Sequence, residues 1–320
     1  MMISCNIFDP VLLDPVRDGA DELYIVSGYA TSAMAFHHLK KIEECGLAEG
    51  SVNLIVGMTS LDGISIDNHK GFQSLMGLYK DRFVCSYVFN QPPVHSKIYV
   101  WCKRDIPVSA FVGSPNYTQN AFYRQREVVN ACDPKEALKY FSSLSKETIY
   151  CTHGDVDNVV RMHKKIYTEP EDKSMSPGKP IITGLETVNV SLLNHMGEMH
   201  GKAGLNWGQR GARNRNEAYI PLKADIVHSD FFPEKGIHFT VNTDDGKILI
   251  CTRAQGDSGG KAIQTPHDNS LIGEYFRNRM GLMSGDFVTK NDLLNYGRTD
   301  VDFYKIDFET FFMDFSVGGS

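Results

Sequence analysis

The chain has 320 residues and a formal net charge of −6, and at about 100–200 residues per domain this length predicts two domains. No apolar run reaches the roughly 18 residues that a membrane-spanning helix needs, and the N-terminus lacks a basic region followed by an apolar stretch. The seven cysteines are scattered and form no Cys-x-x-Cys pair, which argues against a disulfide framework and a zinc site. These features exclude membrane and secreted proteins and predict a cytoplasmic one.

The first half of the chain alternates predicted strands and helices. A buried strand at residues 23–30 precedes a helix that is capped by Thr31 or Ser32 and ends near Gly46. The later elements are strands at 52–57, 83–89, 94–101, 108–112 and 126–131 and helices at 72–80, from Asp133 onward and at 155–166. This alternation predicts an α/β domain with a central mixed sheet that helices cover on both faces.

Residues 168–180 contain three prolines and no apolar periodicity, so they predict a linker between a domain of residues 1–167 and one of residues 181–320. Beyond it, Thr243-Asp244-Asp245-Gly246 has the composition of a hairpin turn. The other predicted elements are strands at 187–193, 218–222, 236–241, 247–253, 261–265 and 301–307 and helices at 269–280 and 290–296. This pattern predicts a mostly β domain in the form of an open barrel.

Chemically reactive side chains follow one another between His95 and Glu127. His95 and Lys97 lie in a β-branched and aromatic run, and the strand period of two places both on one face. Gly113-Ser114-Pro115-Asn116 follows the next strand, and Glu127 lies in the third. We therefore expect the His, Lys, Asn and Glu side chains to meet at one mouth of the sheet.

The spacing His-x-Lys is a weak signal by itself, because His38-Leu39-Lys40 and His163-Lys164-Lys165 share it. Both lie in helix-like segments without a Gly-Ser-x-Asn sequence downstream, so we expect solvated helix faces there. Only the run from His95 combines the spacing with the downstream motif. Within that motif Ser114 has two open roles, one in catalysis and one in holding the turn.

Residues 201–216 carry four basic side chains and no acidic one, which is a local charge of +4 in an acidic chain. Arginine is the commonest reader of guanine in DNA, and Asn and Gln read adenine. The candidate DNA-contacting residues of this segment are Gln209, Arg210, Arg213, Asn214 and Arg215, with Trp207 as a packing anchor. A second candidate arm consists of Arg253, Gln255 and Lys261, and Arg277 and Arg279 on the following helix are candidates either for phosphate contacts or for solubility alone.

His-x-Lys, then Gly-Ser-x-Asn, then a Glu eleven residues after the Asn resembles the phospholipase D superfamily, and within it the BfiI-like restriction endonucleases of the NgoFVII family. The resemblance extends to residues 204–210 and 213–221, which are similar to the DNA-recognition domain of that family. It implies a bacterial protein whose second domain is a pseudobarrel like the plant B3 DNA-binding domain. One position departs from the superfamily pattern, since Cys102 stands where the pattern has Asp five residues after the Lys.

The resemblance implies a type II-like, site-specific endonuclease for double-stranded DNA. Two His-x-Lys motifs make one active site in this superfamily, and the single usable copy here implies a homodimer that shares one catalytic centre. One His95 would form a phosphohistidine, while the second would protonate the leaving oxygen. Lys97, Asn116 and Ser114 would bind phosphoryl oxygens, and Glu127 would accept a hydrogen bond from an imidazole. Such chemistry needs neither a metal ion nor another cofactor.

Two other functions stay open from the sequence. A phosphodiesterase for lipids or small molecules fits the first domain but not the Arg-rich second one, and a DNA-binding protein with a silent nuclease domain does not fit the intact His95–Glu127 set. Asp245-x-Lys247 has the local pattern of a Mg²⁺-dependent nuclease, but it lies in a predicted hairpin turn without an acidic partner. The recognition sequence and the need for a separate helicase-ATPase subunit are left open.

Overall fold

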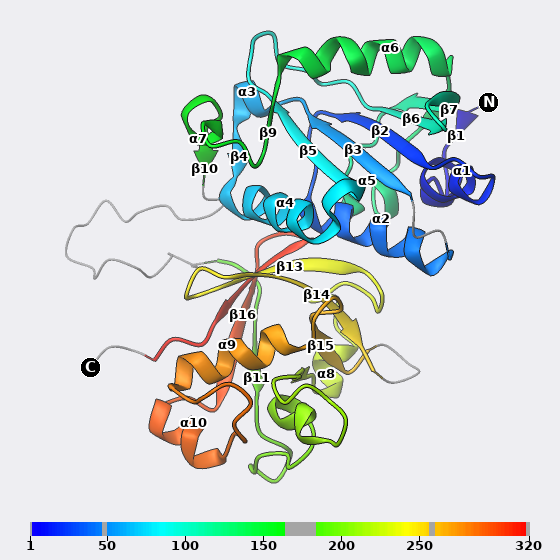
Figure 1. Cartoon of the computed structure of the whole chain (residues 1–320). Coiled ribbons are helices and arrows are strands. Elements are labelled where there is room, and N and C mark those ends of the chain that lie inside the picture. Colours follow the sequence, from blue (N-terminus) through cyan, green and yellow to red (C-terminus); the bar gives the residue numbers. More distant parts are fainter. Residues whose placement is uncertain (1, 47–49, 164–183, 256–259, 318–320) are drawn as a thin grey trace. The chain divides into compact units, whose positions relative to one another are not determined.

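The structure is a computed structural model that describes residues 2–46, 50–163, 184–255 and 260–317. It divides into two compact units, Met1–Lys165 and Ile166–Ser320 (Figure 1). The linker predicted at residues 168–180 lies outside the described residues, so its bounds stay a prediction. Among the described residues, no helix is both long enough and apolar enough to cross a membrane.

An eight-stranded mixed sheet forms the centre of the first unit, as predicted. Its strands, from one edge to the other, are β1 (Met2–Ile3), β8 (Val129–Ala131), β7 (Ile106–Gly113), β6 (Ile98–Lys103), β2 (Glu22–Ser27), β3 (Ser51–Val56), β5 (Phe83–Val88) and β9 (Thr148–Tyr150). The strands β2, β3 and β5 run parallel, while β6 is antiparallel to β2. The middle strands are rich in β-branched residues and buried, as expected for strands covered on both faces.

Helices pack on the two faces of this sheet (Figure 1). On one face α6 (Pro134–Leu144) lies over β7, β6 and β2, where Phe141 packs with Val26 and Ile55. On the other face α4 (Ile66–Tyr79) lies over β5 and contacts α2 (Ser32–Glu44). The shorter helical segments are η1 (Asp9–Leu13), α1 (Asp14–Arg17), α3 (Thr59–Asp62), η2 (Lys80–Arg82), α5 (Gln119–Tyr123), η3 (Ser145–Glu147) and α7 (Val156–Val159).

Several elements of the first unit differ from the prediction. The strand expected at residues 126–131 begins at Val129, so Glu127 lies before it and not in it. Residues 155–166 were expected to form one helix, but α7 ends at Val159 and β10 (Met162–His163) then pairs with β4 (Ile64–Ser65). The strand expected from residue 94 begins at Ile98, because its partner β2 ends at Ser27 and the register stops at Val26 opposite Ile98. Residues 94–97 therefore extend beyond the sheet, with their polar groups at its mouth.

The expectation that His38 lies on a solvated helix face is wrong. Its side chain is fully buried in α2, where one ring nitrogen lies 2.8 Å from the Tyr117 hydroxyl and the other 2.9 Å from the Leu12 carbonyl oxygen. Burial lowers the pKa of the imidazole to about 4, which is only partly offset by the hydrogen bond to Leu12. His38 is therefore a neutral core residue at pH 7. The other histidine of that spacing, His163, lies half-buried in β10 and not on a helix.

The neutral state of His38 predicts a loss of stability in mild acid. The unfolded chain protonates this histidine below pH 6.5, while the folded chain resists protonation down to about pH 4. Between these values the free energy of unfolding should fall as the pH falls, by up to about 3 kcal/mol. Urea unfolding followed by the fluorescence of Trp101 should show this slope, and His38→Gln should flatten it. An equal slope in both proteins would assign the pH dependence to other groups.

The second unit is a seven-stranded, barrel-like sheet, as predicted. Its strand order is β11 (Thr187–Ser191), β16 (Asp300–Lys305), β17 (Thr310–Asp314), β13 (His238–Thr243), β14 (Ile248–Ala254), β15 (Ala262–Gln264) and β12 (Ile220–Pro221), and the two edge strands β11 and β12 touch. The helical segments are η4 (Gly204–Gln209), α8 (Ala224–Val227), α9 (Ser270–Met280) and α10 (Lys290–Tyr296). Aromatic rings fill the inside, among them Phe232, Phe239 and Phe311, whose centroids lie 5.1–5.6 Å apart.

Candidate functional site

His95 and Lys97 lie at the mouth of the sheet, in the extended segment that leads into β6. The His95 side chain is exposed, while Lys97 is 7% exposed. The Lys97 ammonium donates to the His95 carbonyl oxygen at 2.8 Å and lies 3.0–3.1 Å from the ring nitrogens of His95. Burial lowers the pKa of Lys97, and the negative charge of Glu127 partly offsets this effect. Both residues precede β6, so the predicted strand face does not apply to them, although their polar ends lie next to each other.

Gly28, at the end of β2, brings Asn116 next to this pair. A Cβ atom on Gly28 would lie 2.8 Å from Cδ2 of His95 and 3.4 Å from Oδ1 of Asn116, so both side chains lie directly over the glycine. The Tyr29 backbone N–H donates to Oδ1 of Asn116 at 3.2 Å, which leaves the amide nitrogen as the end that can donate to a ligand. Gly28 belongs to none of the motifs that the sequence contains. The available signal was a glycine at the end of a buried strand, which is typical of a close backbone approach.

Ser114 directly follows β7, and Glu127 lies in the loop that leads into β8. The Ser114 hydroxyl donates a short hydrogen bond to the Glu127 carboxylate and accepts one from the Val128 backbone N–H at 3.0 Å. These two contacts show Ser114 holding the turn, which was one of its two open roles. Among the described residues Glu127 makes no hydrogen bond to His95, so the expected carboxylate–imidazole contact does not form within one chain.

The close contact at Gly28 yields a prediction. Gly28→Ala should lower the cleavage rate by roughly 100-fold, because the new methyl group must displace His95 or Asn116 by up to an ångström. Gly77→Ala in α4 is a matched control, since a Cβ there meets nothing within 4 Å. Single-turnover cleavage should separate the two variants, with the control near the wild-type rate. A fully active Gly28→Ala would show that the close packing over this glycine is not needed for catalysis.

In the second unit, residues 209–215 form a loop that several hydrogen bonds and an ion pair attach to the rest of the unit. The Gln209 amide donates to the carbonyl oxygens of Gly285 at 3.0 Å and Arg215 at 3.3 Å. Arg213 pairs with Glu217 and lies with its guanidinium 3.9 Å from the centroid of the Trp207 ring, which packs edge-on against Tyr219. Trp207 is thus a packing residue, as interpreted from the sequence, and Arg213 is largely engaged within the domain.

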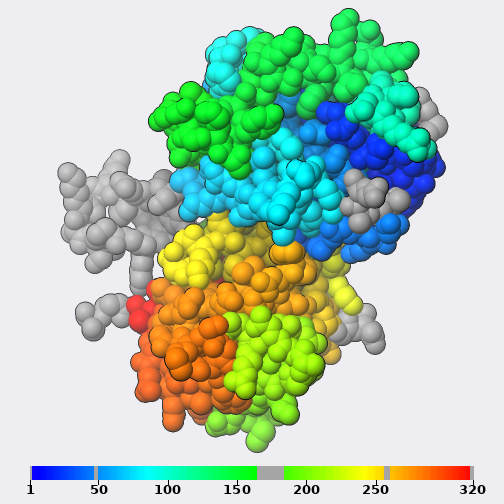
Figure 2. All heavy atoms as spheres, in the orientation of Figure 1, coloured from blue at the N-terminus to red at the C-terminus, as the bar shows by residue number. Residues whose placement is uncertain are grey.

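The remaining side chains of this loop face outward. Arg210 is exposed and uses its Nε to donate to the Lys202 carbonyl oxygen at 2.7 Å. Asn214 is exposed and accepts from the Asn216 backbone N–H at 3.0 Å. Arg215 is exposed, and among the described residues its guanidinium makes no hydrogen bond. Figure 2 shows residues 200–220 beside α9 and α10 on one face of the unit.

In the second candidate arm, the prediction that Arg253 contacts DNA is wrong. This arginine is 5% exposed, and its guanidinium donates to the carbonyl oxygens of Val227, Pro233 and Gly260. It therefore holds the end of α8 and two loop segments together and is not available for contacts with DNA. Lys261 is exposed, while Gln255 has a positive φ and its carbonyl oxygen accepts from the Lys261 backbone N–H at 3.0 Å. Residues 256–259 between them lie outside the described residues.

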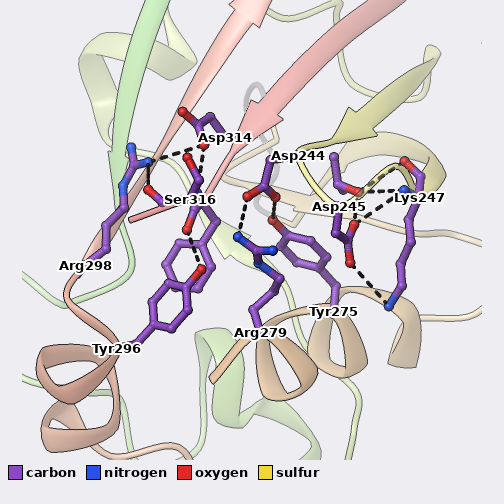
Figure 3. Close-up of polar contacts among 11 residues, drawn as sticks. Asp244, Asp245, Lys247, Tyr275, Arg279, Tyr296, Arg298, Asp314 and Ser316 are labelled. Carbon is purple, nitrogen blue, oxygen red and sulfur yellow. Dashed lines mark hydrogen bonds and ion pairs between the residues drawn. The ribbon is translucent and has the colours of Figure 1, made fainter. Parts of the chain in front are cut away.

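The two arginines of α9 also act within the domain. Arg277 is 1% exposed, and its guanidinium donates to four backbone carbonyl oxygens, so it is not available for DNA phosphates. Arg279 points toward Asp244, which also accepts from the Tyr275 hydroxyl (Figure 3). Burial raises the pKa of Asp244, an effect that the Tyr275 hydroxyl and the Arg279 charge oppose. These contacts tie α9 to the hairpin of β13 and β14.

Asp245 and Lys247 form part of the turn between β13 and β14, as interpreted from the sequence. The Thr243 hydroxyl donates to Asp245 and accepts from the Lys247 backbone N–H at 2.9 Å, which closes the hairpin. Figure 3 shows Asp245 and Lys247 next to each other in this turn. Within the described residues, no group of three or more His, Cys, Asp or Glu side chains is arranged to hold a metal ion.

Comparisons with known proteins match each of the two units to a domain of one family. Residues 5–158 match the model of the NgoFVII restriction endonuclease N-terminal phospholipase D domain, and residues 181–307 match the NgoFVII C-terminal B3-like DNA-binding domain. No curated protein matches the sequence.

Solved structures are similar to about half of the chain. NucT from Helicobacter pylori is 17% identical with a TM-score of 0.31, over 47% of this chain and 97% of that one. Nuc of the phospholipase D family from Salmonella typhimurium is 16% identical with a TM-score of 0.33, over 47% and 95%. The polyphosphate kinase from Porphyromonas gingivalis is 13% identical with a TM-score of 0.32, over 48% and 25%. The two family models together cover most of the chain, and the protein belongs to the NgoFVII restriction endonuclease family of phosphodiester hydrolases.

Proposed function

We propose that this DNA endonuclease cuts both strands at a specific site without a metal ion, through a covalent bond between DNA and His95. The observation that carries the proposal is the cluster over Gly28, where the His95 imidazole, the Lys97 ammonium and the Asn116 amide meet at one mouth of the sheet. An exposed imidazole next to a buried cation and an amide donor suits attack on a phosphodiester, whose negative charge the two donors stabilise.

The reaction takes place in two displacements at phosphorus. A ring nitrogen of one His95 attacks phosphorus, the bond to one sugar oxygen breaks, and the second His95 of a dimer gives that oxygen its proton. Water then attacks the phosphohistidine, gives a proton to the second imidazole and releases the first. Lys97 and Asn116 bind the non-bridging oxygens in both steps, where a divalent ion would act in other nucleases.

The requirement for a dimer follows from the single usable histidine motif. The sequence His38-x-Lys40 has the same spacing, but both ring nitrogens of His38 are hydrogen-bonded in the core, so it cannot serve as the second acid. We infer that two chains each contribute one His95. Within its own chain Glu127 accepts from the Ser114 hydroxyl through Oε2, and we propose that its other carboxylate oxygen accepts from the imidazole of the partner chain.

Subunit mixing tests the shared site. Adding a tenfold excess of His95→Ala protein and allowing the subunits to exchange should abolish most of the wild-type cleavage, because mixed dimers lack one of the two imidazoles. Adding wild-type protein in the same excess should not. Full activity in the mixed sample would contradict the shared site.

Cleavage in a chelator tests the metal-free chemistry. Plasmid DNA should be cut into discrete fragments by the purified protein in EDTA, and sequencing of the ends should give one recognition site. Because ATP hydrolysis cannot proceed in EDTA, this result would also exclude the need for a helicase-ATPase subunit. Loss of cleavage in EDTA that Mg²⁺ restores without an ATPase partner would contradict the proposal.

Arg210 and Arg215 are the proposed readers of sequence, because both are exposed on the loop of residues 209–215. Changing either to alanine should weaken binding to the cognate duplex by ~1–3 kcal/mol where it reads guanine, whereas loss of a phosphate contact should weaken all duplexes equally and lower the salt slope by about one. Arg213→Ala is the matched comparison and should chiefly lower the melting temperature, since Arg213 pairs with Glu217. Titrations of cognate and scrambled duplexes at several salt concentrations separate these outcomes. Unchanged affinity in the Arg210 and Arg215 variants would place the readout elsewhere.

A further inference from the structure

Tyr29 touches both proposed catalytic side chains, although no motif includes it. Its ring meets the His95 imidazole edge-on, with centroids 5.9 Å apart and an interplanar angle of 77°. Its backbone N–H donates to Oδ1 of Asn116 at 3.2 Å. The same residue therefore limits how the imidazole can tilt and which end of the amide faces a ligand.

The Tyr29 ring is itself held from the other side of the mouth. Its hydroxyl donates to the Asp62 carboxylate at 2.5 Å, and this bond raises the pKa of the phenol. Asp62 is the last residue of α3, and α3 is fixed to the end of β2 because the Met58 backbone N–H donates to the Gly28 carbonyl oxygen at 3.0 Å. The ring is thus clamped between His95 and a short helix that is anchored at the site.

We propose that Tyr29 is a positioning residue whose ring fixes the His95 imidazole in its reactive orientation, and that Asp62 fixes this ring. A tyrosine that is 42% exposed contributes little to the core, so neither the edge-on contact nor the hydroxyl contact is explained by burial alone. The inference rests on the proposed role of His95. It adds two residues, Tyr29 and Asp62, that act through it without touching phosphorus.

Four variants test the proposal by single-turnover cleavage at saturating protein. Tyr29→Ala removes the ring and should slow cleavage about 100-fold, the size expected from a misplaced catalytic group. Tyr29→Phe and Asp62→Ala each remove the hydroxyl contact and should slow it about 10-fold. Because both act through one hydrogen bond, the double variant should be no slower than either single one. DNA affinity should stay unchanged in all four.

Tyr150→Ala is the matched control, because Tyr150 is a 57% exposed tyrosine on the edge strand β9. It should cleave at the wild-type rate. Cleavage by Tyr29→Ala within twofold of wild type would overturn the proposal, as would multiplying effects in the double variant. A loss confined to DNA affinity would also overturn it, because Tyr29 would then be a DNA contact.

His95→Ala, measured in the same experiment, distinguishes a failure of the proposed function from a failure of the positioning role. If it still cuts DNA, the proposed function fails. If it is inactive while both Tyr29 variants are fully active, only the positioning role fails.

Discussion

Replacing His95 by alanine is expected to abolish DNA cleavage and leave specific DNA binding intact. Loss of a covalent nucleophile has cost another hydrolase about a million-fold in rate, and His95 is exposed, so its removal leaves no cavity in the core. Binding should survive because the candidate DNA-contacting loop belongs to the other unit of the chain. The measurement pairs plasmid cleavage with a gel shift on the cognate duplex.

His153 provides the control for this variant. It is a half-exposed histidine of the same unit, and its Nδ1 lies 3.8 Å from the Asp155 carboxylate. It follows the last motif residue, Glu127, by 26 positions in the sequence. His153→Ala should cut DNA normally. A His95→Ala protein that cuts at a rate close to wild type would end the phosphohistidine proposal.

Replacing Arg277 by alanine is expected to unfold the second unit far more easily. The guanidinium donates to the carbonyl oxygens of Leu205, Arg215, Gly273 and Asp286, at distances of 2.8–3.3 Å. Its removal takes one donor from each of these carbonyl groups, of which only that of Arg215 is seen to keep a side-chain donor, the Gln209 amide, and the free energy of unfolding should fall by about 3–5 kcal/mol.

Urea unfolding followed by fluorescence can measure this effect in one unit, because the two tryptophans of the chain, Trp101 and Trp207, lie one in each unit. The Trp207 transition should move to lower urea and the Trp101 transition should stay in place. Arg210→Ala is the control, since that side chain is exposed and uses one backbone acceptor. Equal stability of the Arg277 and Arg210 variants would mean that water replaces the lost donors.

The sequence predicts that His95, Lys97 and Asn116 lie together because their spacing carries tertiary information. His95 and Lys97 lie two residues apart before a strand, and Asn116 follows the neighbouring strand, so local patterns suffice to place them together. Gly28 lies 67 residues before His95, and no local pattern shows that the two touch. That contact depends on the pairing of β2 with β6, which follows from the whole sheet.

The basic residues of the second unit show the opposite case. Arginine usually lies on the surface, so the burial of Arg253 and Arg277 contradicts the default interpretation. Their partners are backbone carbonyl groups, which every residue carries and which therefore leave no signal in the sequence. The burial of His38 was not predictable for the same reason, because one of its partners is the backbone carbonyl of Leu12.

The configuration at phosphorus after cleavage shows whether a covalent bond forms between His95 and DNA. The measurement uses a cognate duplex with a phosphorothioate of known configuration at the scissile bond, cut in water enriched in ¹⁸O. Each displacement inverts phosphorus, so two displacements through a phosphohistidine predict retention of configuration. Inversion would show that water attacks the DNA directly and would contradict the account.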